Sequence, residues 1–164
     1  MSRDGSTVVE LAHEDERPDA FERWVRDAEP RLRRAFAGVR GTDLARDAVA
    51  EALAYAWEHW DRVRAMDNGV GYVFRVGQSR TRTRRAPRLP APAEVGLPDV
   101  EPALVPALLE LPDTQRTAVW LVHACGWRQT EVAEAMGLRP STVNTHVARG
   151  LAALRHRLEV GTDA

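Results

Sequence analysis

The chain has 164 residues, of which 44% are hydrophobic and 29% charged, and its net charge is −1. This composition is that of a soluble globular protein with one ordinary domain or two small ones, and it excludes wholesale disorder. No run approaches the roughly 20 apolar residues of a membrane helix, and we expect no signal peptide because the N-terminus lacks a basic start followed by an apolar stretch. The single cysteine, Cys125, excludes an intramolecular disulfide framework and suits a reducing cytoplasm, where we expect the protein.

Charge is unevenly distributed along the chain. Residues 75–88 hold six arginines and no acid, residues 89–115 hold five acids and no base, and the charge of residues 137–158 is all positive. Two basic blocks separated by an acidic one predict two anion-binding surfaces joined by a connector. The chain contains no lysine, so each arginine is a weaker signal of nucleic-acid binding than its number alone indicates.

The N-terminal part predicts a tail followed by a helix. Residues 1–17 are polar, acidic and aperiodic, and we expect a flexible tail there. From Asp19 onward, apolar residues recur at the three-and-four spacing of a buried helical stripe: Phe21, Trp24, Val25, Ala28, Leu32, Ala35 and Phe36. Pro30 predicts a break or kink in this helix, and Gly38 and Gly41 predict its end.

The next segment has the strongest periodic signal in the chain. Thr42 and Asp43 offer an N-cap and a first-turn acid. Apolar residues then share one face: Leu44, Ala48, Val49, Ala52, Leu53, Ala56, Trp57 and Trp60. We expect Trp57 to belong to the core. Asp67-Asn68-Gly69 predicts a turn, and the apolar residues after it predict a third helix that runs into the first arginine block.

Six prolines between Ala86 and Pro106 mark an extended linker, because proline lacks a backbone donor and breaks helices. In the second module that follows, Asp113 is expected to cap a helix that Gly126 ends. A short helix over residues 129–136 and a long one over residues 141–158 complete this module. Since we find no strand pattern and no internal repeat, the sequence predicts an all-α protein.

Residues 129–147 have the pattern of a helix-turn-helix. Gly137 is expected to permit the left-handed turn between two helices, and Leu138 to fill the angle between them. Ser141 or Thr142 is expected to cap the second helix. The residues expected to pack inward are Val132, Ala133, Met136, Val143, Val147, Leu151 and Leu154. A plain helical hairpin with a polar face is the alternative interpretation.

The outward residues at the start of the second helix suit DNA. Such a helix end fits the major groove, where small polar side chains read base edges while arginines and free backbone N–H groups hold phosphates. The candidate DNA-binding residues are Arg139, Ser141, Thr142, Asn144, Thr145, His146 and Arg149. Asn144 and Thr145 are the candidates for base contact, whereas His146 either contacts phosphate or is only solvated.

The segment from Leu109-Glu110-Leu111-Pro112-Asp113-Thr114-Gln115-Arg116 to Leu158 resembles region 4 of the sigma-70 superfamily, in its extracytoplasmic-function (ECF) group. It has the Leu-Pro start, the Gln-Arg pair, the Glu-Val-Ala of the first motif helix and the Ser-Thr-Val that opens the second. The resemblance implies that this module binds the −35 promoter element and the flap of the polymerase β subunit. LuxR-type regulators share a similar motif, including a Thr-Val-x-x-His start.

The segment Asp47-Ala48-Val49-Ala50-Glu51-Ala52-Leu53-Ala54-Tyr55-Ala56-Trp57, followed by Trp60-Asp61-Arg62, is similar to sigma region 2.2. In the family this helix docks on the coiled coil of the polymerase β′ subunit. The resemblance implies that core polymerase is bound by Asp47, Glu51, Glu58 and Arg62. Ala50 is a departure, since the family usually has glutamine before the glutamate.

Residues 72–80 look like sigma regions 2.3 and 2.4, which open the −10 element and capture flipped bases in the family. The implied −10 residues are Arg75, Gln78, Ser79, Arg80, Arg82, Arg84 and Arg85. The family usually shows Arg-Asn, three mostly apolar residues and Asp, where this chain has Gln78-Ser79-Arg80-Thr81-Arg82-Thr83. Promoter melting is therefore the part that the residues support least, and a solvated basic tail is the alternative.

Together the resemblances imply two small helical domains joined by a Pro-rich acidic linker: a tail over residues 1–17, a region 2-like domain over 18–86, the linker over 87–106 and a region 4-like domain over 107–160. The implied function is a sigma factor that binds core RNA polymerase and directs promoter-specific transcription initiation. An anti-sigma factor is a further implied partner, and no membrane insertion is implied. We expect two separately packed bodies without a shared interior.

Other function classes stay open at this point. The main alternative is a helix-turn-helix transcriptional regulator that binds DNA without acting as a polymerase subunit, and another is an interaction protein that kept the sigma shape but lost melting. An enzyme is disfavoured, because the five histidines lack metal-ligand spacing, Cys125 has no neighbouring base, and no Gly-rich phosphate loop follows a strand. We therefore expect no catalytic residue, no metal and no cofactor.

Overall fold

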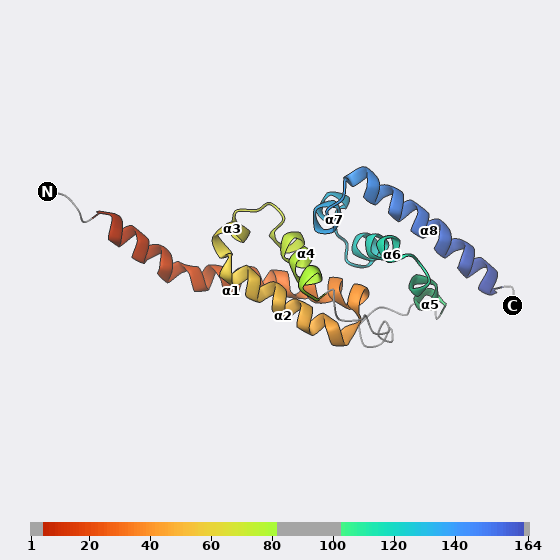
Figure 1. Cartoon of the computed structure of the whole chain (residues 1–164), viewed down its shortest axis with the longest axis horizontal. Helices are drawn as coiled ribbons and strands as arrows, with labels where there is room; N and C mark the ends of the chain where they lie inside the picture. Colours follow the sequence, from red (N-terminus) through yellow and green to blue (C-terminus); the bar gives the residue numbers. More distant parts are fainter. Residues whose placement is uncertain (1–4, 82–102, 163–164) are drawn as a thin grey trace.

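A computed structural model describes the backbone of residues 5–81 and 103–162 and the side chains of residues 16–41, 44–81 and 103–159. All regular structure within these ranges is helical, which confirms the all-α prediction. The N-terminal module contains α1 (Gly5–Arg40), α2 (Thr42–Glu58), α3 (Trp60–Arg64) and α4 (Gly69–Thr81) (Figure 1). The C-terminal module contains α5 (Leu104–Leu109), α6 (Asp113–Val119), the π-helix η2 (Trp120–Ala124), α7 (Gln129–Met136) and α8 (Pro140–Thr162). Within the described ranges, no helix has the length and apolar character that a membrane span requires.

Helix α1 differs from the expectation at both ends. It is assigned from Gly5 to Arg40 with Pro18 and Pro30 inside it. Residues 5–17 of the expected tail are therefore helical, and the helix ends at neither Pro30 nor Gly38. Its N-terminal part projects beyond the rest of the fold (Figure 1). Residues on both sides of Pro30, Ala28 and Leu32, are buried on one face. This packing maintains the helix although a proline removes one of its hydrogen bonds.

Helices α1, α2 and α4 form the core of the N-terminal module. The rings of Phe36 and Phe74 lie 4.6 Å apart between α1 and α4, and a Cβ at Gly77 would lie only 2.7 Å from Phe36 Cζ, so glycine lets α4 approach closely. Helix α2 begins after Gly41, whose φ of 80° breaks the chain away from α1, and no side-chain cap is formed there. The expected N-cap, Thr42, is the first helical residue instead.

Trp57 does not belong to the core. Its side chain is 42% exposed and packs against the edge of the Phe21 ring at 5.0 Å, with the Arg17 guanidinium 5.1 Å above it. The core position that the periodic pattern assigned to it is taken by Trp60, which is 4% exposed. The pattern failed here because α2 ends at Glu58 and a separate short helix, α3, turns Trp60 inward.

The two modules share one interior. The cluster that contains Phe36 and Phe74 continues into the C-terminal module through Leu121, Trp127 and Val132. A smaller cluster belongs to the C-terminal module alone and consists of Ala107, Leu108, Leu111, Val119 and Leu154. The expectation of two separately packed bodies is therefore wrong for this structure. Small modules bury a smaller fraction of their surface than large domains do, so a shared interior increases the apolar area that each module buries.

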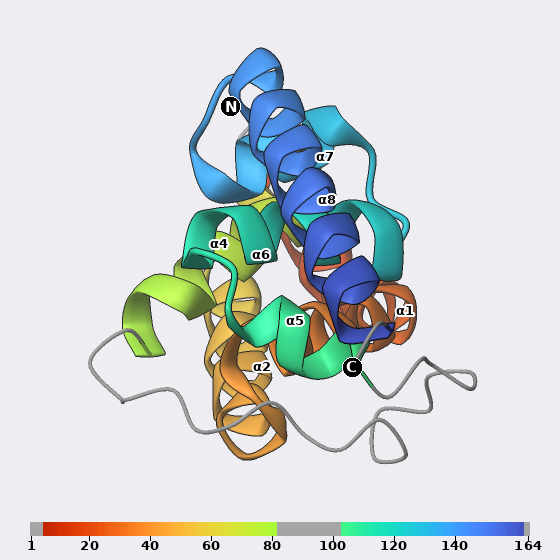
Figure 2. The ribbon, with the colours of Figure 1, turned by 90° about the vertical axis from the view of Figure 1, so that its right-hand side faces the viewer.

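Several local expectations for the C-terminal module are also corrected. Helix α5 includes Pro106, so the expected linker ends earlier, and its residues 87–102 lie outside the described ranges. Pro112 rather than Asp113 precedes α6, and Asp113 instead accepts a hydrogen bond of 2.5 Å from Arg116. Helix α8 begins at Pro140, one residue before the expected cap Ser141. Proline fits the first helical position, because no backbone donor is needed there. Helix α8 packs against α7, α6 and α5 (Figure 2).

Candidate nucleic-acid interface

The helix-turn-helix is built by α7, a tight turn and α8. Gly137 has φ 66° and ψ 36°, the left-handed conformation that glycine adopts without strain. The Leu138 N–H donates to the Ala133 carbonyl at 2.8 Å and closes the turn. Val132 and Val143 are fully buried between the two helices. The turn chemistry and the inward-facing residues therefore follow the sequence pattern.

The start of α7 is held by Glu131, a residue that the sequence analysis did not single out. One Glu131 carboxylate oxygen accepts from the Arg128 backbone N–H at 2.8 Å. Burial acts to raise the pKa of Glu131, but hydrogen bonds from the Arg128 backbone and from the Arg128 and Arg31 side chains outweigh it, so the pKa lies below its ordinary value. The sequence did contain a signal for this role, because a glutamate three residues after the N-cap position is typical of a capping box.

The start of α8 presents an open polar face. Arg139, Ser141, Asn144, Thr145 and Arg149 are exposed, while Thr142 and His146 are half-buried. The Thr145 hydroxyl donates to the Ser141 carbonyl at 3.0 Å, within its own helix. Gly150 lets α8 lie close to α6, since a Cβ there would meet Val119 Cγ2 at 2.6 Å. Six of the seven candidate residues for the −35 element therefore lie on the first turns of α8, and Arg139 directly precedes the helix.

The candidate −10 residues are less free. Arg75, Ser79 and Arg80 are exposed and Gln78 is half-buried; Arg82, Arg84 and Arg85 lie outside the described ranges. The Arg80 guanidinium forms an ion pair of 3.3 Å with Glu51, and both side chains are about half exposed. Two residues that the resemblance assigns to different partners, DNA and polymerase, thus contact each other.

An aromatic cluster beside this ion pair was missed in the sequence. The hydroxyls of Tyr55 and Tyr72 are 2.8 Å apart, and this hydrogen bond raises the pKa of Tyr55 above its ordinary value, with burial acting in the same direction. The His59 ring stacks on Tyr55 at 4.0 Å. Arg80 lies over the Tyr55 ring at 5.1 Å and Arg62 over the Tyr72 ring at 5.3 Å. Aromatic rings beside cations form the kind of surface on which unpaired bases stack.

The candidate polymerase-binding residues lie on α2 and α3. Asp47, Glu51 and Glu58 of α2 and Arg62 of α3 are all exposed. Asp47 and Glu51 are four residues apart and therefore share one face of the helix. Asp47 has an interaction of its own within the protein, and Glu51 is engaged by Arg80. The face is accessible, although two of its acids already have internal partners.

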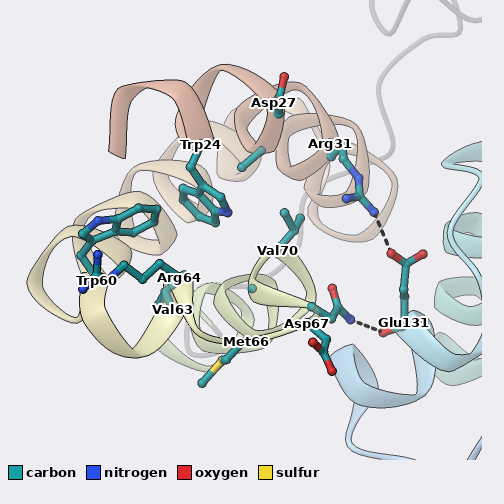
Figure 3. A pocket seen from close by; sticks show the side chains of 13 residues that line it. Trp24, Asp27, Arg31, Trp60, Val63, Arg64, Met66, Asp67, Val70 and Glu131 are labelled. Atoms are coloured by element: carbon teal, nitrogen blue, oxygen red, sulfur yellow. Dashed lines mark hydrogen bonds and ion pairs between the residues drawn. The ribbon is translucent and has the colours of Figure 1, made fainter. Parts of the chain in front are cut away.

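A cavity of about 320 Å³ lies where the modules meet (Figure 3). Trp24 and Trp60 line one side, and on the opposite side Arg31 points at Glu131, with the two side chains 3.3 Å apart. Cys125 directly follows η2, and burial raises its pKa to about 12. Glu131 is the one lining residue from the C-terminal module, and its pairing with Arg31 is a contact between the two modules.

The comparisons with known proteins point in the same direction. The family described as "Sigma-70, region 4" matches residues 103–154. The structure is similar to the sigma factor RpoE from Bartonella quintana, solved with the anti-sigma factor NepR: the TM-score is 0.70 and the identity 25%, over 86% of this chain and 98% of that chain. It is also similar to CnrH, solved with the cytosolic domain of CnrY, with a TM-score of 0.65 and 26% identity over 87% and 90% of the two chains. No curated protein sequence matches the chain significantly.

The family match covers the helix-turn-helix, and the structural matches cover both modules. Helix order, the turn at Gly137 and the exposed start of α8 are consistent with both results. The match of residues 103–154 and the similarity of both modules to these solved structures therefore support a protein of the sigma-70 family, in its extracytoplasmic-function group.

Proposed function

We propose that this protein is a sigma factor that binds core RNA polymerase and directs promoter-specific transcription initiation. The C-terminal helix-turn-helix reads the −35 element, and the N-terminal module binds polymerase and the −10 element. The observation that carries the proposal is the start of α8, where an exposed polar and basic face lies within the segment that matches sigma region 4.

The chemistry of that face supports DNA reading. Asn144 is exposed on the first turns of α8, and an asparagine amide pairs with two atoms of adenine in the major groove. Arg139 and Arg149 flank it and are also exposed, which suits contact with phosphates. Asn144 therefore contributes specificity, while the two arginines contribute affinity for any duplex.

The N-terminal module supports the other half of the proposal through two surfaces. The acids of α2 form the surface for the polymerase β′ coiled coil. The cluster of Tyr55, Tyr72 and their flanking arginines forms a surface for unpaired bases, because it combines aromatic faces with positive charge. Since Arg80 belongs to the second surface and pairs with Glu51 of the first, the two are adjacent.

The proposal includes further partners and a location. Both structural relatives were solved with a partner protein, an anti-sigma factor in the case of RpoE, and we propose an anti-sigma factor as a partner of this chain too. The polymerase β flap is the proposed partner of the C-terminal module. We place the protein in the cytoplasm, where polymerase works, and propose that it acts by binding, with no catalytic residue of its own.

Run-off transcription with purified core polymerase on a library of genomic fragments tests the proposal. The protein is expected to co-purify with core polymerase and to produce defined transcripts that core polymerase alone does not produce. An Asp47→Ala, Glu58→Ala double variant should bind polymerase more weakly. Glu22→Ala, which removes an exposed acid from α1, is the matched control and should bind as the wild type does.

Two outcomes would redirect the assignment. Tight, sequence-specific duplex binding by the isolated chain without any association with polymerase would favour the alternative, a transcriptional regulator that is not a polymerase subunit. Association with polymerase without transcripts from any fragment would favour an interaction protein that has lost promoter opening.

A further inference from the structure

An aromatic cluster at one end of the N-terminal module reaches the surface at Trp57. The ring of Phe21, on α1, packs edge-on against Trp60 at 5.3 Å and against Trp57 at 5.0 Å. Trp60 is 4% exposed, whereas Trp57 is 42% exposed and is one of two large hydrophobic residues with exposed side chains in the described part of the chain. Tryptophan is enriched among the residues that dominate the energy of protein interfaces. Trp57 therefore marks a candidate contact with a partner.

A residue of the chain itself already covers Trp57. The Arg17 guanidinium of α1 lies 5.1 Å from the centre of the Trp57 ring. Its Nη2 donates a hydrogen bond of 2.8 Å to the Trp57 carbonyl. Helix α2 ends one residue later, at Glu58, so this carbonyl belongs to the last turn, whose oxygens lack partners within the helix. Arg17 thus binds both an aromatic face and a free helix carbonyl.

The contact between Arg17 and Trp57 is incompletely satisfied. Arg17 Nε is buried, but it has no hydrogen-bond acceptor among the described residues. A buried N–H without an acceptor costs free energy, and a cation over a partly exposed ring contributes only a small stabilisation. Arg17 is therefore held weakly, and another ligand of the same chemistry can replace it.

Trp57 lies beside the surface of α2 that we propose for polymerase. The acids of that surface share one face of the helix. Ala50, Ala54 and Trp57 are spaced by four and three residues, so they form an adjacent row, and all three are exposed. Arginine suits such a surface, because its guanidinium pairs with carboxylates and also stacks on aromatic rings. The chemistry of the surface therefore favours a partner that presents arginine side chains.

We infer that Arg17 is an internal competitor for this surface: it occupies on Trp57 the position that an arginine of core polymerase takes in the complex. The inference rests on the proposed function for the identity of the partner, whereas the contact between Arg17 and Trp57 is a property of the free chain. Polymerase then has to displace Arg17 before it can bind the ring. Arg17 lowers the apparent affinity by the strength of its own contact, which corresponds to about a two- to fivefold change in Kd.

Three single variants separate competition from a structural role. Arg17→Ala removes the competitor and leaves a residue that favours helix. Arg23→Ala is the matched control, because it removes the same charge from another exposed position of α1. Trp57→Ala removes the ring on which either arginine would bind. Circular dichroism of each variant checks that the helix content is that of the wild type.

The first measurement is the NMR signal of the Arg17 side chain in the full-length free chain. A buried Nε–H exchanges slowly with water, and a guanidinium over an indole has its resonances shifted upfield by the ring current. The Arg17 Nε–H signal, identified by its loss in Arg17→Ala, should be sharp and shifted upfield in the wild type. In Trp57→Ala it should return to the ordinary arginine position. A rapidly exchanging, unshifted signal in the wild type would overturn the inference.

The second measurement is the apparent Kd for core polymerase at one salt concentration. Arg17→Ala should bind about two- to fivefold more tightly than Arg23→Ala, which itself should bind close to the wild type. Trp57→Ala should bind more weakly. In the double variant Arg17→Ala, Trp57→Ala, the loss of Arg17 should bring no further gain, because the ring for which it competes is absent.

The possible failures are distinguishable from one another. If polymerase binds the wild type but binds Arg17→Ala no more tightly than Arg23→Ala, only the inference about Arg17 is wrong. Undiminished binding of Trp57→Ala would also contradict it, since the ring would then lie outside the interface. If neither the wild type nor any variant binds polymerase, the proposed function fails and the competition fails with it.

Discussion

The start of α8 and the end of α4 are both basic surfaces, but their residues differ in how many contacts they make within the protein. At the start of α8, Asn144 and Arg149 are exposed, and α8 packs mainly against α5, α6 and α7 of its own module. At the end of α4, Arg80 is paired with Glu51 and lies over Tyr55, while Arg75 lies against the turn at Gly137. The side chains at the start of α8 are exposed, whereas the arginines at the end of α4 contact other residues of the protein.

The difference shows what decides whether a basic residue is available. Both surfaces follow from local sequence, since each is a run of helix with one polar edge. Availability depends on contacts between residues far apart in the chain, such as Arg80 with Glu51, 29 positions away. A basic segment in a sequence thus predicts where anions bind only after its internal partners are known.

The largest expected effect is on the free energy of unfolding. It compares a buried residue beneath the α4 surface with an exposed residue on the α8 surface. Phe74 of α4 is fully buried and contacts both Phe36 and Trp127, so Phe74→Ala should cost about 3–5 kcal/mol of unfolding free energy in urea denaturation. Asn144→Ala, on the open face of α8, should change it by less than about 0.5 kcal/mol. A cost below about 1 kcal/mol for Phe74→Ala would mean that α4 is not anchored by both modules.

The second effect concerns DNA. Asn144→Ala should cost about 1–3 kcal/mol of binding free energy at the preferred promoter and nothing at other sequences, whereas Arg149→Ala should weaken binding to all sequences and lower the salt slope by about 1. Arg155→Ala, further along α8, is the control and should affect neither. Fluorescence anisotropy of holoenzyme on labelled duplexes measures all three. Unchanged promoter preference in Asn144→Ala would show that the readout assignment is wrong.

A third effect depends on pH and concerns Glu131, which joins the helix-turn-helix to α1. Because its folded-state pKa lies below the ordinary value of about 4.3, its stabilisation is complete above that value and is lost as the pH falls through the folded-state pKa. Glu131→Gln should therefore cost about 1 kcal/mol at neutral pH, as the loss of a cap and first-turn acid does, and less near pH 3. Denaturation at both pH values measures this, and an equal cost at both would contradict it.

The smallest effect tests the engaged surface directly. Arg80 and Glu51 are half exposed, so Arg80→Ala should change the free energy of unfolding by no more than about 1 kcal/mol. It should also leave Glu51 free for polymerase, so core binding should be retained while binding to single-stranded DNA decreases. Surface plasmon resonance with each ligand distinguishes the two. A parallel loss of both would place Arg80 and Glu51 in one binding surface.

Much of the local structure was predictable from the sequence. The bounds of α7, the turn at Gly137 and the buried edge of α8 follow from apolar spacing and one glycine, because these features depend on residues only a few positions apart. Asn68 was predicted as a turn residue, and its side chain indeed accepts from the Gly71 N–H at 2.9 Å. These are short-range effects, for which periodicity and capping rules are sufficient.

What the sequence did not predict depends on contacts across the chain. Nothing near Gly38 indicates that Trp120 packs directly on it, where a Cβ would lie 2.0 Å from Trp120 Cε2, so glycine was interpreted as the end of a helix that in fact continues. Trp57 and Trp60 both fit the apolar stripe, and only the start of α3 after His59 decides that Trp60 is buried. The pairing of Arg31 with Glu131 joins residues 100 positions apart, beyond the reach of any local pattern.

The burial of Cys125 limits how this protein can sense its surroundings. With its pKa raised to about 12, the thiol stays protonated at cellular pH, whereas peroxides and alkylating agents react with the thiolate. It is the only sulfhydryl of the chain. We therefore expect Cys125 to react with peroxides and alkylating agents more slowly in the folded protein than after unfolding, when its pKa returns to its ordinary value.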